Sequence, residues 1–332
     1  MRLLVCLLMA ASLQAAIDGT VVNRTTGKPQ PGVTINLIKP GQGGMRTLGT
    51  AISDAAGHFV FEKDEPGGGP QLLQANYKGV NYNKLLTPNI ATSNVELDIF
   101  EATKSPAVAH VAQQMLMIEP NTSQIGVSET VLVENTTNTT FNNPETGELR
   151  FYLPPAANGQ VRVNAQGPQG MPLPRPAEKT KEADVFKVDF PIKPGETEFD
   201  VNYVLPVGSP FTFHGRLVGV KGMPSGPLRL IAPPGVTLSG KDIQQIGTEP
   251  KTQATIYNVT AAGFFSFDIA GIGSLHQQDT GSDDDADRPQ VTEGNPRIYA
   301  HLRWLLAILF AILGAGLIFL FRNSPVRSPY GK

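Results

Sequence analysis

The side chains that most often carry chemistry are scattered in this sequence rather than grouped. No HExxH, GxSxG, phosphate-binding loop or strand-linked GxGxxG pattern is present, so the familiar patterns of zinc peptidases, serine hydrolases and nucleotide-binding enzymes are missing. Paired carboxylates could still meet in a fold, but no spacing selects a pair. The sequence therefore favours a protein that is not an enzyme, with no catalytic residue, cofactor or metal site. The histidines, none at a metal-like spacing from another, are His58, His110, His214, His276 and His301.

An acidic run near the C-terminal end invites a calcium interpretation. Counted as an EF-hand loop from Asp283, the run has Asp285 and Asp287 at the third and fifth positions. Arg288 stands where that loop needs a glycine, and Gly294 stands where it needs a glutamate. We therefore interpret the run as part of a solvated spacer.

Exposed aromatic rings would be the chemistry of a carbohydrate-binding protein, because the apolar face of a sugar packs on a flat ring. The single tryptophan, Trp304, lies in an apolar run near the C-terminal end and lowers the expectation of a sugar site. Tyr77 and Tyr82, on either side of a turn at Gly79, are the best candidates for a ligand platform. The alternative is that both rings fill the core or the rim of a β-sandwich.

Composition narrows the fold and the partners. The chain has 332 residues, with 27 Lys and Arg against 29 Asp and Glu, and a formal net charge of −2 gives no long-range attraction to nucleic acid. The chain contains 34 glycines and 28 prolines, a content that favours tight turns and short strands over a helix-rich enzyme. The only cysteine, Cys6, excludes a disulfide framework within the chain.

The N-terminal residues carry an export pattern. Residues 1–16 combine Arg2 with an apolar run and two closing alanines, the pattern of a cleaved secretory signal peptide. Removal of this segment also removes Cys6, so the exported chain would contain no cysteine. Because eukaryotic ectodomains usually carry disulfides, the pattern indicates a bacterial envelope protein.

The C-terminal residues predict one membrane span. Residues 302–321 include an uncharged apolar run that as a helix would be about 27 Å long, close to the ~30 Å of a bilayer core. An exported N-terminus and a single span would leave residues 322–332 in the cytoplasm and the rest outside it. Three small residues spaced by four would also let a second copy of the helix approach, which makes self-association through them a hypothesis: Ala307, Ala311 and Ala315.

Residues 17–103 alternate short β-branched runs with turn residues, which predicts a small β-sandwich. In the run VTINLI, every second side chain is apolar, as expected of a strand with one buried face. Asp54 and Gly57 are suited to the turn that precedes the run HFVF, because Asp caps turn backbone and Gly tolerates positive φ.

Four ordered motifs in this region resemble the carboxypeptidase regulatory-like domain, a transthyretin-type sandwich. They are GTV at 19–21, TGKP at 26–29, GVTINL at 32–37 and DAAGHFVF at 54–61. The run EPGGGPQLLQANYKG departs from the Leu-x-Pro-Gly-x-Tyr pattern of the family, so the strand register there stays open. The resemblance implies a β-sandwich with a non-catalytic accessory role, and its fold is shared with starch-binding modules, which permits carbohydrate binding.

Residues 104–272 predict a second, larger β-sandwich. About nine further strand-like runs occur there, among them FTFHGRLVGV, and we expect half-buried antiparallel strands. The run MPLPRPAEKTKEA is interpreted as a protruding extended loop. Residues 273–301 are polar and acidic, as expected of a stalk.

Together these features predict an all-β protein with two tandem β-sandwich domains followed by a single C-terminal transmembrane helix. The expected function is non-catalytic: a membrane-anchored envelope protein that presents its sandwiches for protein binding or scaffolding outside the cytoplasm. The alternative is a carbohydrate-binding protein of the cell envelope. The expected partners are the membrane and an envelope protein or polysaccharide, and not nucleic acid.

Overall fold

The computed structural model describes residues 17–41, 44–61, 69–87, 91–168, 170–208 and 211–275. These residues form β-strands and two short 3-10 helices, so the prediction of an all-β fold is confirmed for this part of the chain. A membrane-spanning helix is not found among the described residues. The predicted signal peptide (1–16), nearly all of the stalk (273–301), the transmembrane helix (302–321) and the tail (322–332) lie outside them.

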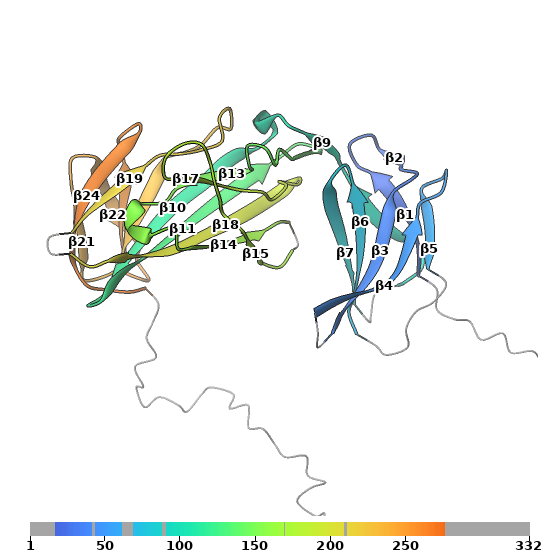
Figure 1. The fold of residues 1–332 in the computed structure, drawn as a ribbon, viewed down its shortest axis with the longest axis horizontal. Coiled ribbons are helices and arrows are strands. Elements are labelled where there is room, and N and C mark those ends of the chain that lie inside the picture. Colours follow the sequence, from blue (N-terminus) through green and yellow to red (C-terminus); the bar gives the residue numbers. More distant parts are fainter. Residues whose placement is uncertain are drawn as a thin grey trace, which may run out of the picture. The chain divides into compact units, whose positions relative to one another are not determined.

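The first region, residues 17–103, contains two four-stranded sheets whose apolar side chains form one core (Figure 1). In one sheet, β1 pairs antiparallel with β2 and β5 and parallel with β8. In the other, the order is β4-β3-β6-β7 and every pair is antiparallel. The bounds are β1 (Ile17–Asn23), β2 (Lys28–Pro29), β3 (Thr34–Gly41), β4 (Gly44–Ile52), β5 (His58–Phe61), β6 (Gln71–Tyr77), β7 (Val80–Leu86) and β8 (Val95–Ile99).

Alternation along the strands produces this core. In β1, Ile17 and Val21 are fully buried, and the residues between them are partly exposed except for a glycine. A side chain at that glycine, Gly19, would place its Cβ only 2.1 Å from the carbonyl oxygen of Val95 on β8. Gly19 is therefore required by the close approach of β8 to β1.

The turn before β5 forms as its residues predict. The carboxylate of Asp54 accepts hydrogen bonds from the backbone N–H groups of Ala56 (2.9 Å) and His58 (2.8 Å). Gly57 has a φ of +76°, which a residue with a side chain rarely adopts. The turn sets the alternation of β5 so that Phe59 is buried in the core.

The second region, residues 104–275, is built on an eight-stranded sheet of order β15-β14-β18-β11-β10-β20-β23-β22 (Figure 1, green to orange). Its pairs are antiparallel except that of β10 with β20, which is parallel, a departure from the expected antiparallel arrangement. The bounds are β10 (His110–Pro120), β11 (Gln124–Asn135), β14 (Val161–Gln166), β15 (Leu173–Arg175), β18 (Gly195–Pro206), β20 (Leu228–Ala232), β22 (Ile243–Thr248) and β23 (Thr255–Val259).

Two three-stranded sheets share a core with this large sheet. Their orders are β13-β17-β16 and β19-β24-β21, so β13 and β19 are edge strands. Buried rings pack at close range in this core, for example Phe213 on Phe267 with centroids 4.9 Å apart. The bounds are β13 (Leu149–Tyr152), β16 (Glu178–Lys179), β17 (Val185–Val188), β19 (Phe211–Arg216), β21 (Val236–Ser239) and β24 (Phe264–Gly271).

Two expectations for the second region are wrong in detail. The segment interpreted as a protruding loop contains two short strands, β15 and β16, which pair with β14 and β17 in different sheets. The run expected to be one strand through Val220 ends as a strand at Arg216. Local pattern could not show either, because strand pairing is a tertiary contact and short edge strands carry little periodicity.

The junction between the regions is also a β pairing. β9 (Glu101–Thr103) pairs parallel with β12 (Thr139–Phe141), so the last strand of the first region is held by the second. The short 3-10 helix η1 (Pro106–Val108) follows β9, and the other, η2 (Pro155–Ala157), follows β13.

Candidate binding surfaces

The two tyrosines predicted as a ligand platform lie in different surroundings. Tyr82, on β7, is 3% exposed, and its hydroxyl donates to the carbonyl of Phe100 and lies 2.9 Å from the hydroxyl of Thr140. Burial raises its pKa to about 12. Tyr82 is therefore a core residue at the junction and presents no open face. Tyr77, at the end of β6, is partly exposed.

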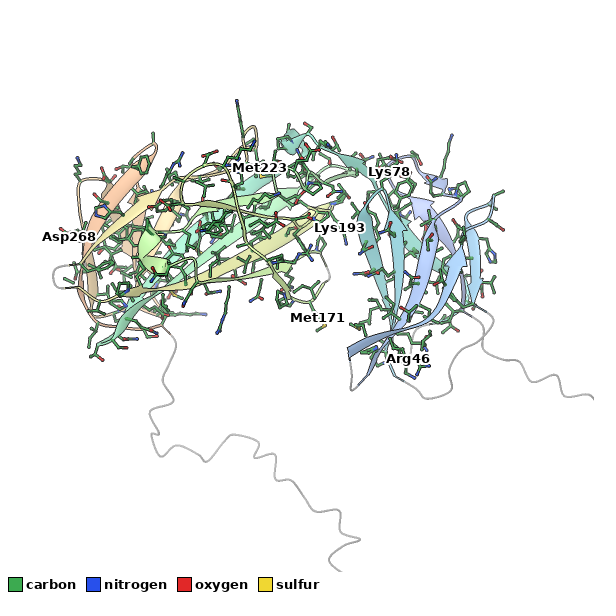
Figure 2. The ribbon with its side chains drawn as sticks, in the orientation of Figure 1. Arg46, Lys78, Met171, Lys193, Met223 and Asp268 are labelled. Carbon is green, nitrogen blue, oxygen red and sulfur yellow. The ribbon has the colours of Figure 1, made fainter. Side chains whose placement is uncertain are left out.

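Tyr77 belongs to a polar cluster around Glu101. Its hydroxyl donates to Glu101 at 2.7 Å, and the amide of Asn23 donates to the same oxygen at 2.8 Å. The ammonium of Lys78 pairs with Glu101 and lies 5.3 Å from the centre of the Tyr77 ring (Figure 2). The hydrogen bond from Lys78 is the main reason that the pKa of Glu101 is lowered. These partners hold the Tyr77 ring in place, which suits a structural role as well as a surface one.

A second lysine lies at the junction. The Lys193 ammonium donates to the carbonyl of Asn81 at 2.5 Å and lies 5.2 Å from the centre of the Tyr82 ring (Figure 2). Burial lowers the pKa of Lys193 to about 8. Lys193, a residue of the second region, therefore covers the ring of the buried Tyr82.

An edge strand of the first region is open. Among the described residues β4 pairs only with β3, and each of its residues is at least partly exposed. Met45 and Ile52 on this strand are 70% and 66% exposed. An edge strand offers unpaired backbone groups to an additional strand. Leu48 of β4 forms a bulge opposite Leu37 and Ile38, and bulges are one way in which natural edge strands limit edge-to-edge pairing.

The second region contains an apolar cleft of about 440 Å³, which we call the β13–β19 cleft. Its floor includes Val131 and Val133 on β11 of the large sheet. One wall is the edge strand β13, and another is the connection that follows β19, residues 217–227. Met223 lies on that connection (Figure 2). The size is within the roughly 300–1,000 Å³ of small-molecule sites, and the lining is mostly aliphatic, as such sites require.

Two arginines converge on one carboxylate beside this cleft. Arg150, on β13, lines the cleft and donates to Glu182 at 2.6 Å. Arg216, at the end of β19, donates to the other oxygen of Glu182 at 3.3 Å. The Nε of Arg150 is buried and has no hydrogen-bond partner among the described residues. The Glu182 side chain itself is 48% exposed.

A small cavity that shares Gln114 with the cleft contains a buried carboxyl. Glu129, on β11, is 7% exposed, and the Gln114 amide donates to it at 2.6 Å. Burial raises the pKa of Glu129. Gln114 lines both the cleft and this small cavity. A second acid, Glu148, lines the cleft itself, but its oxygens accept backbone N–H groups of Asn143 and Phe190.

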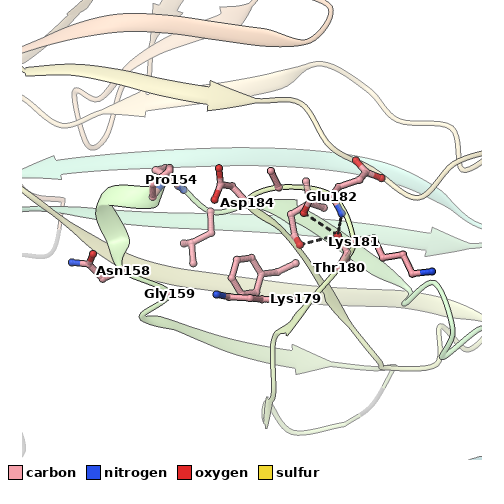
Figure 3. Close-up of a pocket in the computed structure, with 13 residues that line it drawn as sticks. Pro154, Asn158, Gly159, Lys179, Thr180, Lys181, Glu182 and Asp184 are labelled. Atoms are coloured by element: carbon pink, nitrogen blue, oxygen red, sulfur yellow. Dashed lines mark hydrogen bonds between the residues drawn. The ribbon is translucent and has the colours of Figure 1, made fainter.

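A polar depression of about 460 Å³ adjoins Glu182 (Figure 3). It lies between residues 153–159 and residues 179–186 and carries side chains of both charges, including Lys179, Lys181 and Asp184. The Thr180 hydroxyl closes this loop by accepting from the backbone N–H of Glu182 at 3.1 Å. The loop that carries Glu182 therefore forms one wall of this depression.

The histidines that the structure describes, His58, His110 and His214, do not assemble with other metal-binding side chains. His58 lies 3.9 Å from Asp18, and His110 lies 3.3 Å from Glu134, each pair partly exposed. Within the described ranges, no group of three His, Cys, Asp or Glu side chains is placed to hold a metal ion. His276, His301 and the acidic run lie outside the described residues.

Sequence reasoning identified the turn and strand residues but not the cleft. Its charged residues stand at positions 150, 182 and 216 and come together only because β13, β19 and the loop before β17 meet on one side of the large sheet. One local signal was present: the glycine- and proline-rich run from Gly219 to Pro227, which is too irregular for the predicted strand.

No protein-family model and no curated protein matches this sequence. Solved structures that match include the M1 zinc metallopeptidase from Deinococcus radiodurans, at 14% identity over 49% of this chain and 42% of that chain, with a TM-score of 0.27. A single-residue variant of that enzyme matches over the same shares with a TM-score of 0.26, and a two-domain M1 zinc metallopeptidase variant bound to L-tryptophan matches with 13% identity and 0.27. The chain spans less than half the length of these peptidase chains, and similarity at this level carries no argument about its fold or activity.

Proposed function

We propose that this chain is a non-catalytic, membrane-anchored protein of the bacterial envelope that binds another protein outside the cytoplasm. The export and membrane patterns of residues 1–16 and 302–321 support the location. The motifs resembling a carboxypeptidase regulatory-like domain support an accessory role for residues 17–103.

The observation that carries the binding proposal is the open edge of β4. The strand has nine residues, and its exposed methionine and isoleucine provide apolar contacts at its two ends, Met45 and Ile52. An extended segment of a partner would add to this edge through backbone hydrogen bonds, with its side chains packing on the apolar contacts. The bulge at Leu48 bends the edge and works against symmetric pairing of two copies, whereas an extended segment of a different protein can follow the bent strand, and we take the partner to be such a protein.

The test is site-specific photo-crosslinking of the full chain in its own membranes, with a photoreactive residue in place of Thr47 on β4. We expect a discrete adduct, identified by mass spectrometry as one envelope protein. The double variant Met45→Lys and Ile52→Lys should remove that adduct, because charges on an edge strand oppose pairing. Both sites are exposed, so the folded state should change by less than about 0.5 kcal/mol.

The matched control is Val207→Lys, since Val207 is also an exposed aliphatic residue and directly follows β18. This variant should leave the adduct unchanged. Absence of a discrete adduct, or an adduct that survives the β4 double variant, would contradict the proposal. Retention of the full chain on a glycan array that is lost with Tyr77→Ala would instead establish the carbohydrate-binding alternative.

A further inference from the structure

The β13–β19 cleft combines an aliphatic lining with Arg150, and a second arginine, Arg216, lies beside it on the same carboxylate. The cleft lies in a different region from the β4 edge. Leu217, Val220 and Met223 in its lining are partly exposed and pack against the buried core, so they offer an apolar surface to hydrocarbon. Arg150 supplies the only basic side chain of this lining. A ligand that satisfied both parts would carry one negative group on an apolar chain.

The arginine pair already holds a carboxylate. Glu182 accepts from Arg150 with one oxygen and from Arg216 with the other, which is the geometry that a free carboxylate would adopt. Glu182 belongs to a loop and is 48% exposed, so its carboxylate can return to water when another replaces it. The buried Nε of Arg150, which has no hydrogen-bond partner in the described part of the chain, is a further donor for an incoming anion.

We propose that the β13–β19 cleft binds a fatty acid, with the hydrocarbon chain along the partly exposed aliphatic side chains of the connection 217–227 and the carboxylate in the place that Glu182 occupies between Arg150 and Arg216. Glu182 then acts as an internal competitor. Glu148 does not oppose the ligand strongly, because both of its oxygens accept backbone N–H groups and its burial disfavours the charge.

The test uses the full chain in native membranes and a photoreactive, alkyne-tagged dodecanoate. The chain should become labelled, with adducts on peptides that include residues 217–228. The same probe with an alcohol in place of the carboxylate should label at least about tenfold less, since a charge-assisted pair of this kind is worth more than 1.4 kcal/mol and each 1.4 kcal/mol is tenfold. Octanoate and hexadecanoate competitors then define the length that the cleft accepts.

Two variants separate recognition from folding. Arg150→Gln should reduce labelling about tenfold, because it removes the charge at the cleft wall. Glu182→Gln should increase labelling, because it removes the competing charge while keeping the shape of the side chain. The matched control is Arg229→Gln: Arg229 is an exposed arginine on β20, next to the lining residue Leu228 but on the other face of the strand.

A third variant fills the cleft without touching its charges. A Cβ at Gly219, which lines the cleft, would meet no atom within 4 Å, so Gly219→Phe adds a ring to open space and should block labelling. Gly247→Phe is the control, because that glycine on β22 is equally open but lies outside the cleft. Labelling that is equal with acid and alcohol probes, or that decreases with Glu182→Gln, would overturn the proposal. The β4 crosslink would be unaffected by either result.

Discussion

In the first region four strands face four, whereas in the second an eight-stranded sheet faces two sheets of three strands each. The facing layer of the second region is thus divided, and the edge strands β13 and β19 belong to different sheets. The β13–β19 cleft lies where the connection 217–227, the edge strand β13 and β11 of the large sheet meet. A facing layer made of two separate sheets therefore provides strand edges at which a cleft can form.

The regions also place their acids differently. In the first region Glu101 lies at the junction among donors from Asn23, Tyr77 and Lys78. In the second, Glu129 is buried in the small cavity that shares Gln114 with the cleft and has one amide donor, from Gln114. The surroundings of Glu101 favour its charged form, whereas the burial of Glu129 favours its neutral form.

The largest expected effect tests whether the two cores are separate. Phe59→Ala in the first core and Phe213→Ala in the second each remove a ring that is 2% exposed, and each should cost about 3–5 kcal/mol. Hydrogen exchange of the full chain should show lost protection mainly in the region that carries the substitution. Equal loss in both regions for either variant would show that they unfold as one cooperative unit.

A smaller effect should appear in the dependence of stability on pH. Because the pKa of Glu129 is raised, its carboxyl keeps a proton in the native state at pH values where the unfolded chain has lost it, so the second region should become less stable as pH rises above 4.5. The lowered pKa of Glu101 gives the opposite sign: its contribution is present above 4.5 and is lost as pH falls.

Melting of the full chain between pH 4 and 7, followed by region-resolved exchange, measures both slopes. Glu129→Gln should flatten the slope of the second region and stabilise it at pH 7, because Gln keeps the shape without the buried charge. Glu101→Gln should flatten the slope of the first region and destabilise it. Lys193, with a pKa of about 8, titrates above this range. If stability changed with pH in the same direction in both regions, the contrast drawn between Glu101 and Glu129 would be wrong.

The smallest effect concerns the junction. Tyr82→Phe keeps the buried ring but removes the hydroxyl that meets Phe100 and Thr140, and it should cost about 0.5–1.5 kcal/mol. Because Thr140 belongs to the second region, the variant should also reduce the coupling between the unfolding of the two regions. Thr140→Val is the reciprocal variant, and a double-mutant cycle gives the coupling energy. A coupling near zero would show that the contact is incidental.

Much of the first region could be predicted from local pattern. The alternation in VTINLI and HFVF set which side chains are buried, and Asp54 with Gly57 formed the expected turn. Tyr82 shows the limit of such reasoning: its neighbours in sequence do not distinguish an exposed ring from one covered by Thr140 and Lys193, which lie far along the chain.

The sequence by itself determined that the described part of the chain is all-β, because two-residue periodicity and frequent turn residues are local properties. It also carried the export and membrane patterns on which the proposed location depends. Only the tertiary structure decided that β4 is left at an edge and that Arg150, Glu182 and Arg216 meet beside a cleft. The physical reason is that strand order and sheet packing depend on contacts between distant residues, which no local period encodes.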